Sequence, residues 1–204
     1  YYPIGRHGMY RKDIPSPSFP ELAYSSTGIC SDDTILTLTI ADSIREQWGI
    51  NMDDIIGRHV KAVQDEPFWF WKGTRTSMEQ IANGADWKMK KDVSFGNGVM
   101  MKQSPFAFYE AMTWEKVSEA LSTLAQITHA HPVSLVITKL HHSLLVDIIL
   151  SSDEYFDMQY WLTEWIQYAK ICEDEFHAER MVSWLLLDIQ KDLHQWLTLE
   201  DIYA

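Results

Sequence analysis

The chain has 204 residues with a formal net charge of −12 at pH 7, and 46% of its residues are hydrophobic. This composition is typical of a globular protein with a sizeable core and excludes a disordered chain. The acidic balance argues against nucleic acid or an anionic membrane as a partner, because both repel an acidic surface. Cys30 and Cys172 stand in no metal or redox spacing. They predict idle thiols in a reducing compartment and therefore a cytoplasmic location.

Helical signals dominate the chain after an irregular start. Residues 1–27 hold four of the seven prolines, and residues 87–105 read as a polar loop. No segment alternates with period two for long, and no uninterrupted apolar run reaches the roughly 18 residues of a membrane span. The expected helices cover residues 32–48, 51–63, 74–83, 118–128, 133–150, 158–169 and 176–197. We therefore predict an all-α protein that forms a single domain over residues 1–204.

Residues 31–34 read Ser-Asp-Asp-Thr at the start of the first expected helix. The carboxylates of Asp32 and Asp33, flanked by the hydroxyls of Ser31 and Thr34, are hard oxygen ligands of the kind that Mg²⁺ or Ca²⁺ prefers. Acidic residues in a first turn also stabilise the helix dipole, and serine or threonine also caps a helix. Taken alone, the tetrapeptide is more typical of a helix start, with metal binding as the alternative.

A second candidate lies in the polar loop, where residues 94–98 read Ser-Phe-Gly-Asn-Gly. Two glycines around an asparagine let backbone N–H groups approach a ligand closely, as in loops that bind phosphate oxygens. An ordinary Asn-Gly turn is the competing interpretation. Lys102 follows four residues later and would add a positive charge.

Histidines near the following helix ends form the third group. His129 stands at a helix end and could donate to a phosphate or ribose oxygen, although a histidine there often only interacts with the helix dipole. His141 and His142 are adjacent on a helix and therefore face different directions. They make a poor metal-binding pair.

In order and spacing, these pieces resemble the ADP-ribosylglycohydrolase family, which includes dinitrogenase reductase-activating glycohydrolase. The matching stretches are Ser31–Thr34 with the helix that follows, Gly73–Arg75, Ser94–Gly98 continuing to Pro105, and Thr128–His129 with Pro132. The resemblance covers roughly residues 29–150, followed by divergent helices over residues 151–204. It implies an orthogonal all-α bundle with a binuclear Mg²⁺ centre in a cleft. The implied reaction is cleavage of the glycosidic bond between ADP-ribose and an acceptor such as arginine or serine.

The resemblance also implies roles for individual residues. Ser31, Asp32 and Asp33 are expected to ligate the metal, and Asp32 and Asp33 are also the expected catalytic residues. The substrate-binding residues are expected to be Ser94, Gly96, Asn97, Gly98 and His129. The loop would bind the pyrophosphate and adenosine side, and the histidine would contact a ribose or phosphate oxygen. The expected partner is an ADP-ribosylated protein or another ADP-ribose derivative.

The sequence departs from the family in its second metal-binding segment, a glycine-rich stretch with Asp-x-Asp-Thr. No glycine follows Gly98, so the printed sequence does not contain that segment. We therefore expect one Mg²⁺ site built from Ser31, Asp32 and Asp33 rather than two. Two functions stay open, a glycohydrolase and a catalytically degenerate binding or interaction module. The tryptophans of the last helices (Trp161, Trp165, Trp184 and Trp196) are expected in the core, with a protein-binding surface as the alternative.

Overall fold

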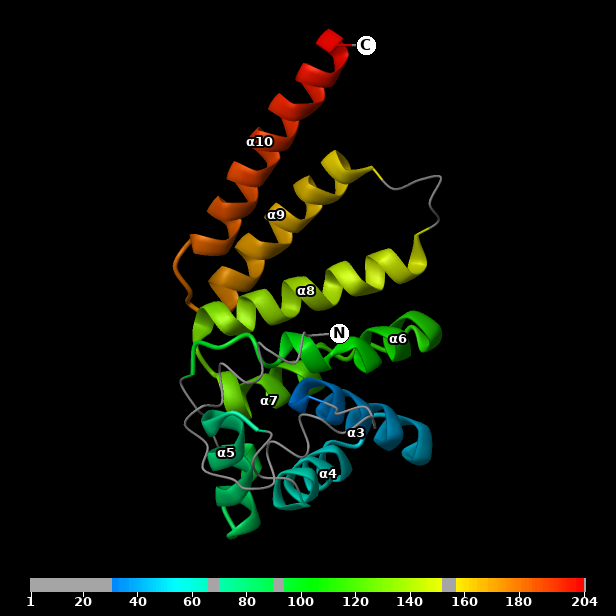
Figure 1. Cartoon of the computed structure of the whole chain (residues 1–204), viewed down its shortest axis with the longest axis vertical. Coiled ribbons are helices and arrows are strands. Elements are labelled where there is room, and N and C mark those ends of the chain that lie inside the picture. Colours follow the sequence, from blue (N-terminus) through cyan, green and yellow to red (C-terminus); the bar gives the residue numbers. More distant parts are fainter. Residues whose placement is uncertain (1–30, 66–69, 90–93, 152–156, 204) are drawn as a thin grey trace, which may run out of the picture. The chain divides into compact units, whose positions relative to one another are not determined.

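The structure is a computed structural model that describes residues 31–65, 70–89, 94–151 and 157–203, with side chains up to residue 193. Contacts group residues 32–204 into one compact unit that is distinct from residues 1–31. The described ranges contain helices and no strand, which confirms the all-α prediction (Figure 1). The helices are α3 (Asp32–Gln47), α4 (Met52–Asp65), α5 (Lys72–Ala82), η2 (Trp87–Met89), η3 (Met100–Lys102), α6 (Ser104–Thr113), α7 (Ser118–His129), α8 (Pro132–Leu150), α9 (Met158–Glu175) and α10 (Met181–Tyr203).

The helix ends follow the capping signals of the sequence. Asn51 caps α4, because its side-chain oxygen accepts a hydrogen bond from the backbone N–H of Asp54 at 3.1 Å. Gly84, just after α5, has a φ of +95°, which glycine adopts without strain. At the end of α3 the left-handed residue is Trp48, with a φ of 55°, and not the neighbouring Gly49. The expected stop is therefore right within one residue.

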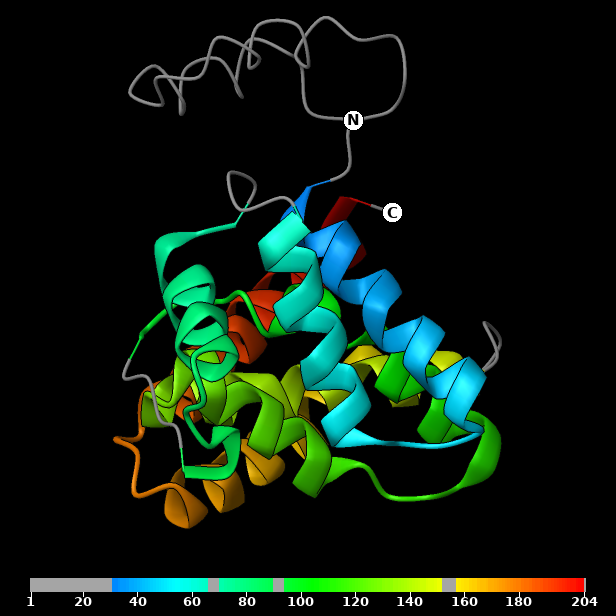
Figure 2. The same ribbon diagram turned by 90° about the horizontal axis from the view of Figure 1, so that it is seen from below.

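A hydrophobic core lies between α3, α4, α5, α6 and α7. Neighbouring pairs in this group are α3 with α4, α4 with α5, α5 with α7 and α3 with α6, and Figure 2 shows α3 and α4 side by side. The most deeply buried side chains of this core are Ile40, Ile55, Ile56, Met78, Phe106, Leu121 and Leu124. Burial of each such side chain contributes about 1.5–3 kcal/mol before chain entropy is counted. This core fixes the start of α3, which carries the two adjacent aspartates.

Helix α8 packs against α6 and α7 on one side of the bundle and against α9 on the other. By length and composition alone, α8 could also cross a membrane, since its 19 residues are strongly apolar. The sequence prediction concerned uninterrupted apolar runs, whereas the stretch that qualifies here includes Lys139 and Asp147. Helix α8 packs against α6, α7, α9 and α10, and 33% of its apolar stretch is buried. A single helix of this kind is weak evidence for a span.

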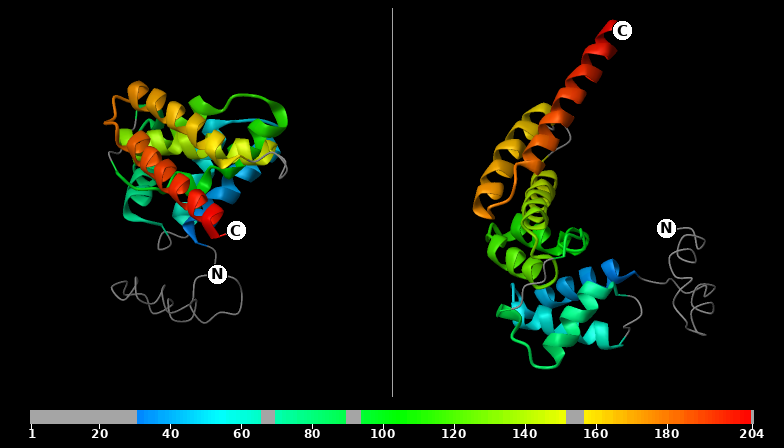
Figure 3. Two further views of the ribbon diagram at one scale, coloured as in Figure 1. Left: turned by 90° about the horizontal axis from the view of Figure 1, so that it is seen from above. Right: turned by 90° about the vertical axis from the view of Figure 1, so that its left-hand side faces the viewer.

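Helices α9 and α10 form a hairpin that packs on α8, and Figure 3 shows the pair side by side. Ala169 and Cys172 of α9 are fully buried against Val133 and Val136 of α8, together with Val182 of α10. Cys172 is a free, buried thiol, as expected, whereas Cys30 lies outside the described residues.

The hairpin corrects the prediction for the tryptophans. Trp165 is buried and donates a hydrogen bond to Asp147 at 3.2 Å, but Trp184 is 64% exposed. Trp161 is half-buried and stacks on Trp165, and the side chain of Trp196 is outside the described part. Apolar residues occupy more than one face of α10, so helical spacing alone did not show which face meets α9.

Two further elements differ from the sequence prediction. Helix α6 was missed, because Ser104–Thr113 is apolar on most sides and shows no helical period. The last helix starts at Met181 rather than at residue 176, since Phe176 caps the end of α9. The expected loop over residues 87–105 contains the short helices η2 and η3.

Candidate functional site

The two adjacent aspartates occupy the first turn of α3. Asp32 and Asp33 are both half-buried, and Ser31 directly precedes them in the sequence. Burial and the neighbouring charge of Asp32 raise the pKa of Asp33, and the charge of Lys102 opposes that rise. A carboxylate with a raised pKa accepts a proton more readily near neutral pH than an ordinary one.

Helix η3 lies against the first turns of α3 and brings Lys102 to the aspartates. The hydroxyl of Thr37 donates to the carbonyl of Met101 at 3.2 Å and to that of Asp33 at 2.7 Å, which ties the two helices together. Lys102 is only 1% exposed, and its Nζ has no hydrogen-bond partner within the described part of the chain. Burial lowers the pKa of Lys102 to about 8, while the charges of Asp32 and Asp33 act in the opposite direction.

The glycine loop packs against His129. His129 is buried at the end of α7, and its Nδ1 lies 2.8 Å from the hydroxyl of Thr128. A Cβ at Gly96 would lie 2.8 Å from Nε2 of His129, and one at Gly98 would lie 2.9 Å from its Cε1. No real side chain fits at such distances. The loop backbone therefore packs directly on the imidazole ring.

This contact gives a steric reason for glycine at both positions. Among the described glycines only Gly84 has a positive φ, so Gly96 and Gly98 are not needed for a left-handed turn. They are needed because the loop backbone approaches a ring closely. The group approached is a side chain of the protein itself, and the N–H of Met100 closes a turn onto the carbonyl of Asn97 at 3.0 Å, so the ligand-binding role of the loop stays a prediction.

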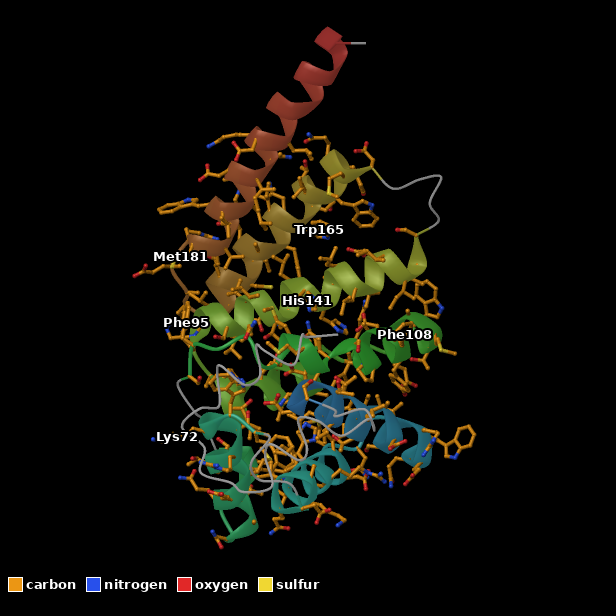
Figure 4. All side chains as sticks on the ribbon, in the orientation of Figure 1. Lys72, Phe95, Phe108, His141, Trp165 and Met181 are labelled. Atoms are coloured by element: carbon orange, nitrogen blue, oxygen red, sulfur yellow. The ribbon has the colours of Figure 1, made fainter. Side chains whose placement is uncertain are left out.

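A hollow of about 140 Å³ opens beside the loop, between the loop, η3 and α8. Its walls are Phe95, Gly96, Asn97, Met100, Ser134, Ile137 and Thr138. The exposed ring of Phe95 stands edge-on to His131, with 4.7 Å between ring centroids, near the start of α8 (Figure 4). A cavity of roughly 150 Å³ holds one benzene-sized ring, so this hollow suits a single ring of a larger ligand.

The loop and the aspartates are joined by η3. The carbonyl of Asn97 accepts from the backbone N–H of Met100 at 3.0 Å, so the loop runs straight into the turn that carries Lys102. Met100 lines the hollow. Lys102, two residues later, interacts electrostatically with Asp32 and Asp33. The sequence had placed Lys102 with the loop as an added positive charge. Its burial beside α3 was missed, because nothing in the local sequence shows which helix η3 packs on.

The oxygen donors fit one hard cation. Asp32 and Asp33 supply carboxylates, and Mg²⁺ in proteins is often held by one or two carboxylates together with water and substrate oxygens. Over residues 31–65, 70–89, 94–151 and 157–203, no group of three or more histidine, cysteine, aspartate or glutamate side chains comes together. The buried ammonium of Lys102 further disfavours a second cation. In this part of the chain the two aspartates are therefore the candidate donors, and a single Mg²⁺ site stays a prediction.

The adjacent histidines of α8 contact two different neighbours. His141, labelled in Figure 4, hydrogen-bonds the amide of the fully buried Gln103, and burial lowers the pKa of His141. His142 lies 3.1 Å from Glu110 of α6, which also accepts from Lys116 at 2.7 Å. The prediction that the two histidines do not act as a metal-binding pair agrees with this geometry.

Comparison with known proteins decides the family. The family model described as ADP-ribosylglycohydrolase matches residues 4–199. The chain belongs to the ADP-ribosylglycohydrolase family. The match extends beyond residues 29–150, over which the sequence resemblance was seen, and includes α9 and most of α10. No curated protein and no solved structure matches the chain.

Membership in the ADP-ribosylglycohydrolase family supports a glycohydrolase-like function on ADP-ribosylated substrates. The family is generally dependent on divalent cations. The single-domain prediction, the roles of individual site residues, the dependence on Mg²⁺ in particular and the cytoplasmic location stay predictions.

Proposed function

We propose that this chain binds ADP-ribosyl groups and hydrolyses the glycosidic bond that joins them to a protein side chain. The observation that carries the proposal is the contact of Gly96 and Gly98 with His129, in a loop that continues through η3 to the Asp32–Asp33 pair. This arrangement supplies a loop for a nucleotide and carboxylates for a sugar within one continuous structure.

The loop side is suited to the adenosine diphosphate part of the ligand. The hollow beside Phe95 and Asn97 has room for one ring, and we assign it to the base. Backbone N–H groups of the exposed loop then face the pyrophosphate, as in other phosphate-binding loops. His129 holds the loop backbone in place through the two glycines, so its ring sets the position of these donors.

The carboxylate side is suited to the ribose. We assign Asp32 and Asp33 to the ribose and its glycosidic carbon, where negative charge stabilises an oxocarbenium-like transition state. Asp33 takes the proton from the attacking water at its carboxylate oxygen and returns it to the departing side-chain nitrogen or oxygen. The glycosidic bond therefore breaks as the bond from the water oxygen to the sugar carbon forms. A bound Mg²⁺, held by Asp32 and Asp33, would orient the ribose hydroxyls and the water.

Release of ADP-ribose from modified peptides tests this proposal. Peptides ADP-ribosylated on arginine or on serine are incubated with the protein and Mg²⁺, and free ADP-ribose is measured. We expect release from at least one linkage, and a loss of about 100-fold or more in rate for Asp33→Asn, the size typical of a lost general base. No release from either linkage would contradict the proposal that the chain is a hydrolase.

The second candidate is a binding module without catalysis. It is favoured by Lys102, whose buried charge gives the aspartates a counter-ion in the absence of any metal. Calorimetry with ADP-ribose separates the two functions. Binding that is unchanged when Mg²⁺ is removed, together with no release, supports the module, whereas binding that needs Mg²⁺ supports the enzyme.

A further inference from the structure

The side chain of Lys102 is buried without a hydrogen-bond partner. It is 1% exposed, and its Nζ reaches no acceptor in the part of the chain that the structure describes. Unpaired buried ammonium groups are costly, so opposite charge has to compensate for the lost hydration. The opposite charges that act on Lys102 are those of Asp32 and Asp33.

The position of Lys102 is held by the fold and does not depend on a flexible surface chain. Thr37 fastens α3 to η3 at Met101, and the N–H of Lys102 donates to the carbonyl of Val99 at 3.2 Å. His59 of α4 is also fully buried and lies within electrostatic reach of Lys102. Burial lowers the pKa of His59 well below its usual range, so this imidazole adds no second positive charge.

We propose that the ammonium of Lys102 is the resident counter-ion of the Asp32–Asp33 pair and competes with a divalent cation for that pair. The two ionised aspartates and the lysine together carry one net negative charge instead of two. A divalent cation that enters therefore meets a weaker attraction and a like charge that cannot move into solvent. The consequence is one weakly held ion at most.

This inference deepens the proposed function, since it concerns the same carboxylates, but it requires no turnover. It predicts the metal affinity of the ligand-free protein. A protein that binds metal as described and releases no ADP-ribose would contradict only the proposed hydrolysis. A protein that releases ADP-ribose with a metal affinity indifferent to Lys102 would contradict only this inference.

Titration calorimetry of Mg²⁺ into the full chain tests the inference. Lys102→Met keeps the length of the side chain and removes its charge. We expect it to bind Mg²⁺ at least about tenfold more tightly than the unaltered protein, because removing a buried like charge that acts on the same carboxylates removes a repulsion of the incoming cation. Unchanged or weaker affinity of Lys102→Met would overturn the inference.

Lys139→Met is the matched control. Lys139 is also mostly buried, with its side chain 12% exposed, but it pairs with Glu175 of α9 at 2.6 Å. Its removal is expected to leave the Mg²⁺ affinity unchanged, and an equal gain in both variants would overturn the inference by showing a general charge effect. Should Lys102→Met give no folded protein, Lys102→Gln is titrated in the same way and judged by the same outcomes.

Discussion

Glu173 and Lys102 are the most deeply buried carboxylate and ammonium side chains among the described residues, and their surroundings differ sharply. Glu173 of α9 is 0% exposed and accepts hydrogen bonds from the N–H groups of Val182 and Ser183 at 2.8 and 3.0 Å, and from the Ser183 hydroxyl at 2.7 Å. Arg180 adds a further contact at 3.4 Å. Lys102 is equally buried but has no hydrogen-bond partner within the described residues.

The difference lies in how each charge is compensated. Glu173 satisfies the backbone donors at the start of α10, which have no partner inside their own helix, and so it fixes the hairpin. Lys102 fixes nothing by hydrogen bonding, and its charge is balanced only by Asp32 and Asp33. An unsatisfied buried group calls for an explanation, and a functional role is one of the recognised explanations.

The largest expected effect on stability comes from removing Glu173, whose buried carboxylate is fully hydrogen-bonded. Glu173→Ala leaves several buried donors of α10 unpaired and should lower the free energy of unfolding by about 3 kcal/mol. Glu173→Gln keeps one acceptor oxygen and should lose less. Urea denaturation measures both, and ADP-ribose binding should be unaffected in the folded fraction. A loss below about 1 kcal/mol for Glu173→Ala would show that Glu173 does not hold the hairpin.

The glycine loop should respond next most strongly. Gly96→Ala places a methyl group 2.8 Å from His129 Nε2, so the ring or the loop must move. Overpacking of this kind should lower the unfolding free energy by about 1–3 kcal/mol and weaken ADP-ribose binding.

Gly57→Ala, in the exposed middle of α4, is the control for this variant. A Cβ at Gly57 meets nothing within 4 Å. The control should stabilise the protein by about 0.5–1 kcal/mol, since alanine is a better helix former. If the two variants have equal thermal unfolding temperatures, the proposed packing of the loop on His129 is wrong.

Lys102 should make stability rise with alkaline pH. Its pKa is lowered to about 8 in the folded protein, below the value of 10.5 expected when unfolded. Between these values the unfolded chain binds more protons, so the unfolding free energy rises as the pH rises. We expect a gain of about 1–3 kcal/mol in the unaltered protein relative to Lys102→Met, measured by urea denaturation at pH 7.5 and 10. Parallel pH profiles of the two proteins would contradict the lowered pKa.

The smallest effect is expected at the exposed tryptophan of α10. Trp184 is 64% exposed, so Trp184→Gln should change the unfolding free energy by no more than about 0.5 kcal/mol. Trp165→Gln, in the buried position on α9, should destabilise by about 3 kcal/mol. Chemical denaturation of this pair checks the corrected placement of the two tryptophans, and similar losses would show that Trp184 is also part of the core.

Much of the fold could be predicted because its signals are local. Asn51, Gly84 and the acidic start of α3 mark helix ends by their own chemistry, and these elements were found within a few residues. Helix α6 was missed because it is apolar on most sides, so the sequence carried no periodic signal. The exposed side of Trp184 depends on which face of α10 meets α9, and that choice is made by tertiary packing.

The site could be predicted only as separate pieces. The sequence motifs predicted Asp32, Asp33, the loop at 94–98 and His129 as site residues. The structure brings the loop and His129 into contact. The part played by Lys102 could not be read locally, because its partners lie about 70 positions earlier in the chain and are reached through the packing of η3 on α3. Close packing of a loop can be recognised in the sequence because it requires glycines. Charge balance between residues on different helices gives no such local signal.

Calorimetric titration of ADP-ribose, with Mg²⁺ present, into the unaltered protein and into His129→Ala tests the central claim most directly. We expect the unaltered protein to bind, and His129→Ala to bind at least about tenfold more weakly, because the loop loses the ring on which it packs. Equal affinities would show that the loop on His129 is not the binding site. No binding to the unaltered protein would contradict the account as a whole.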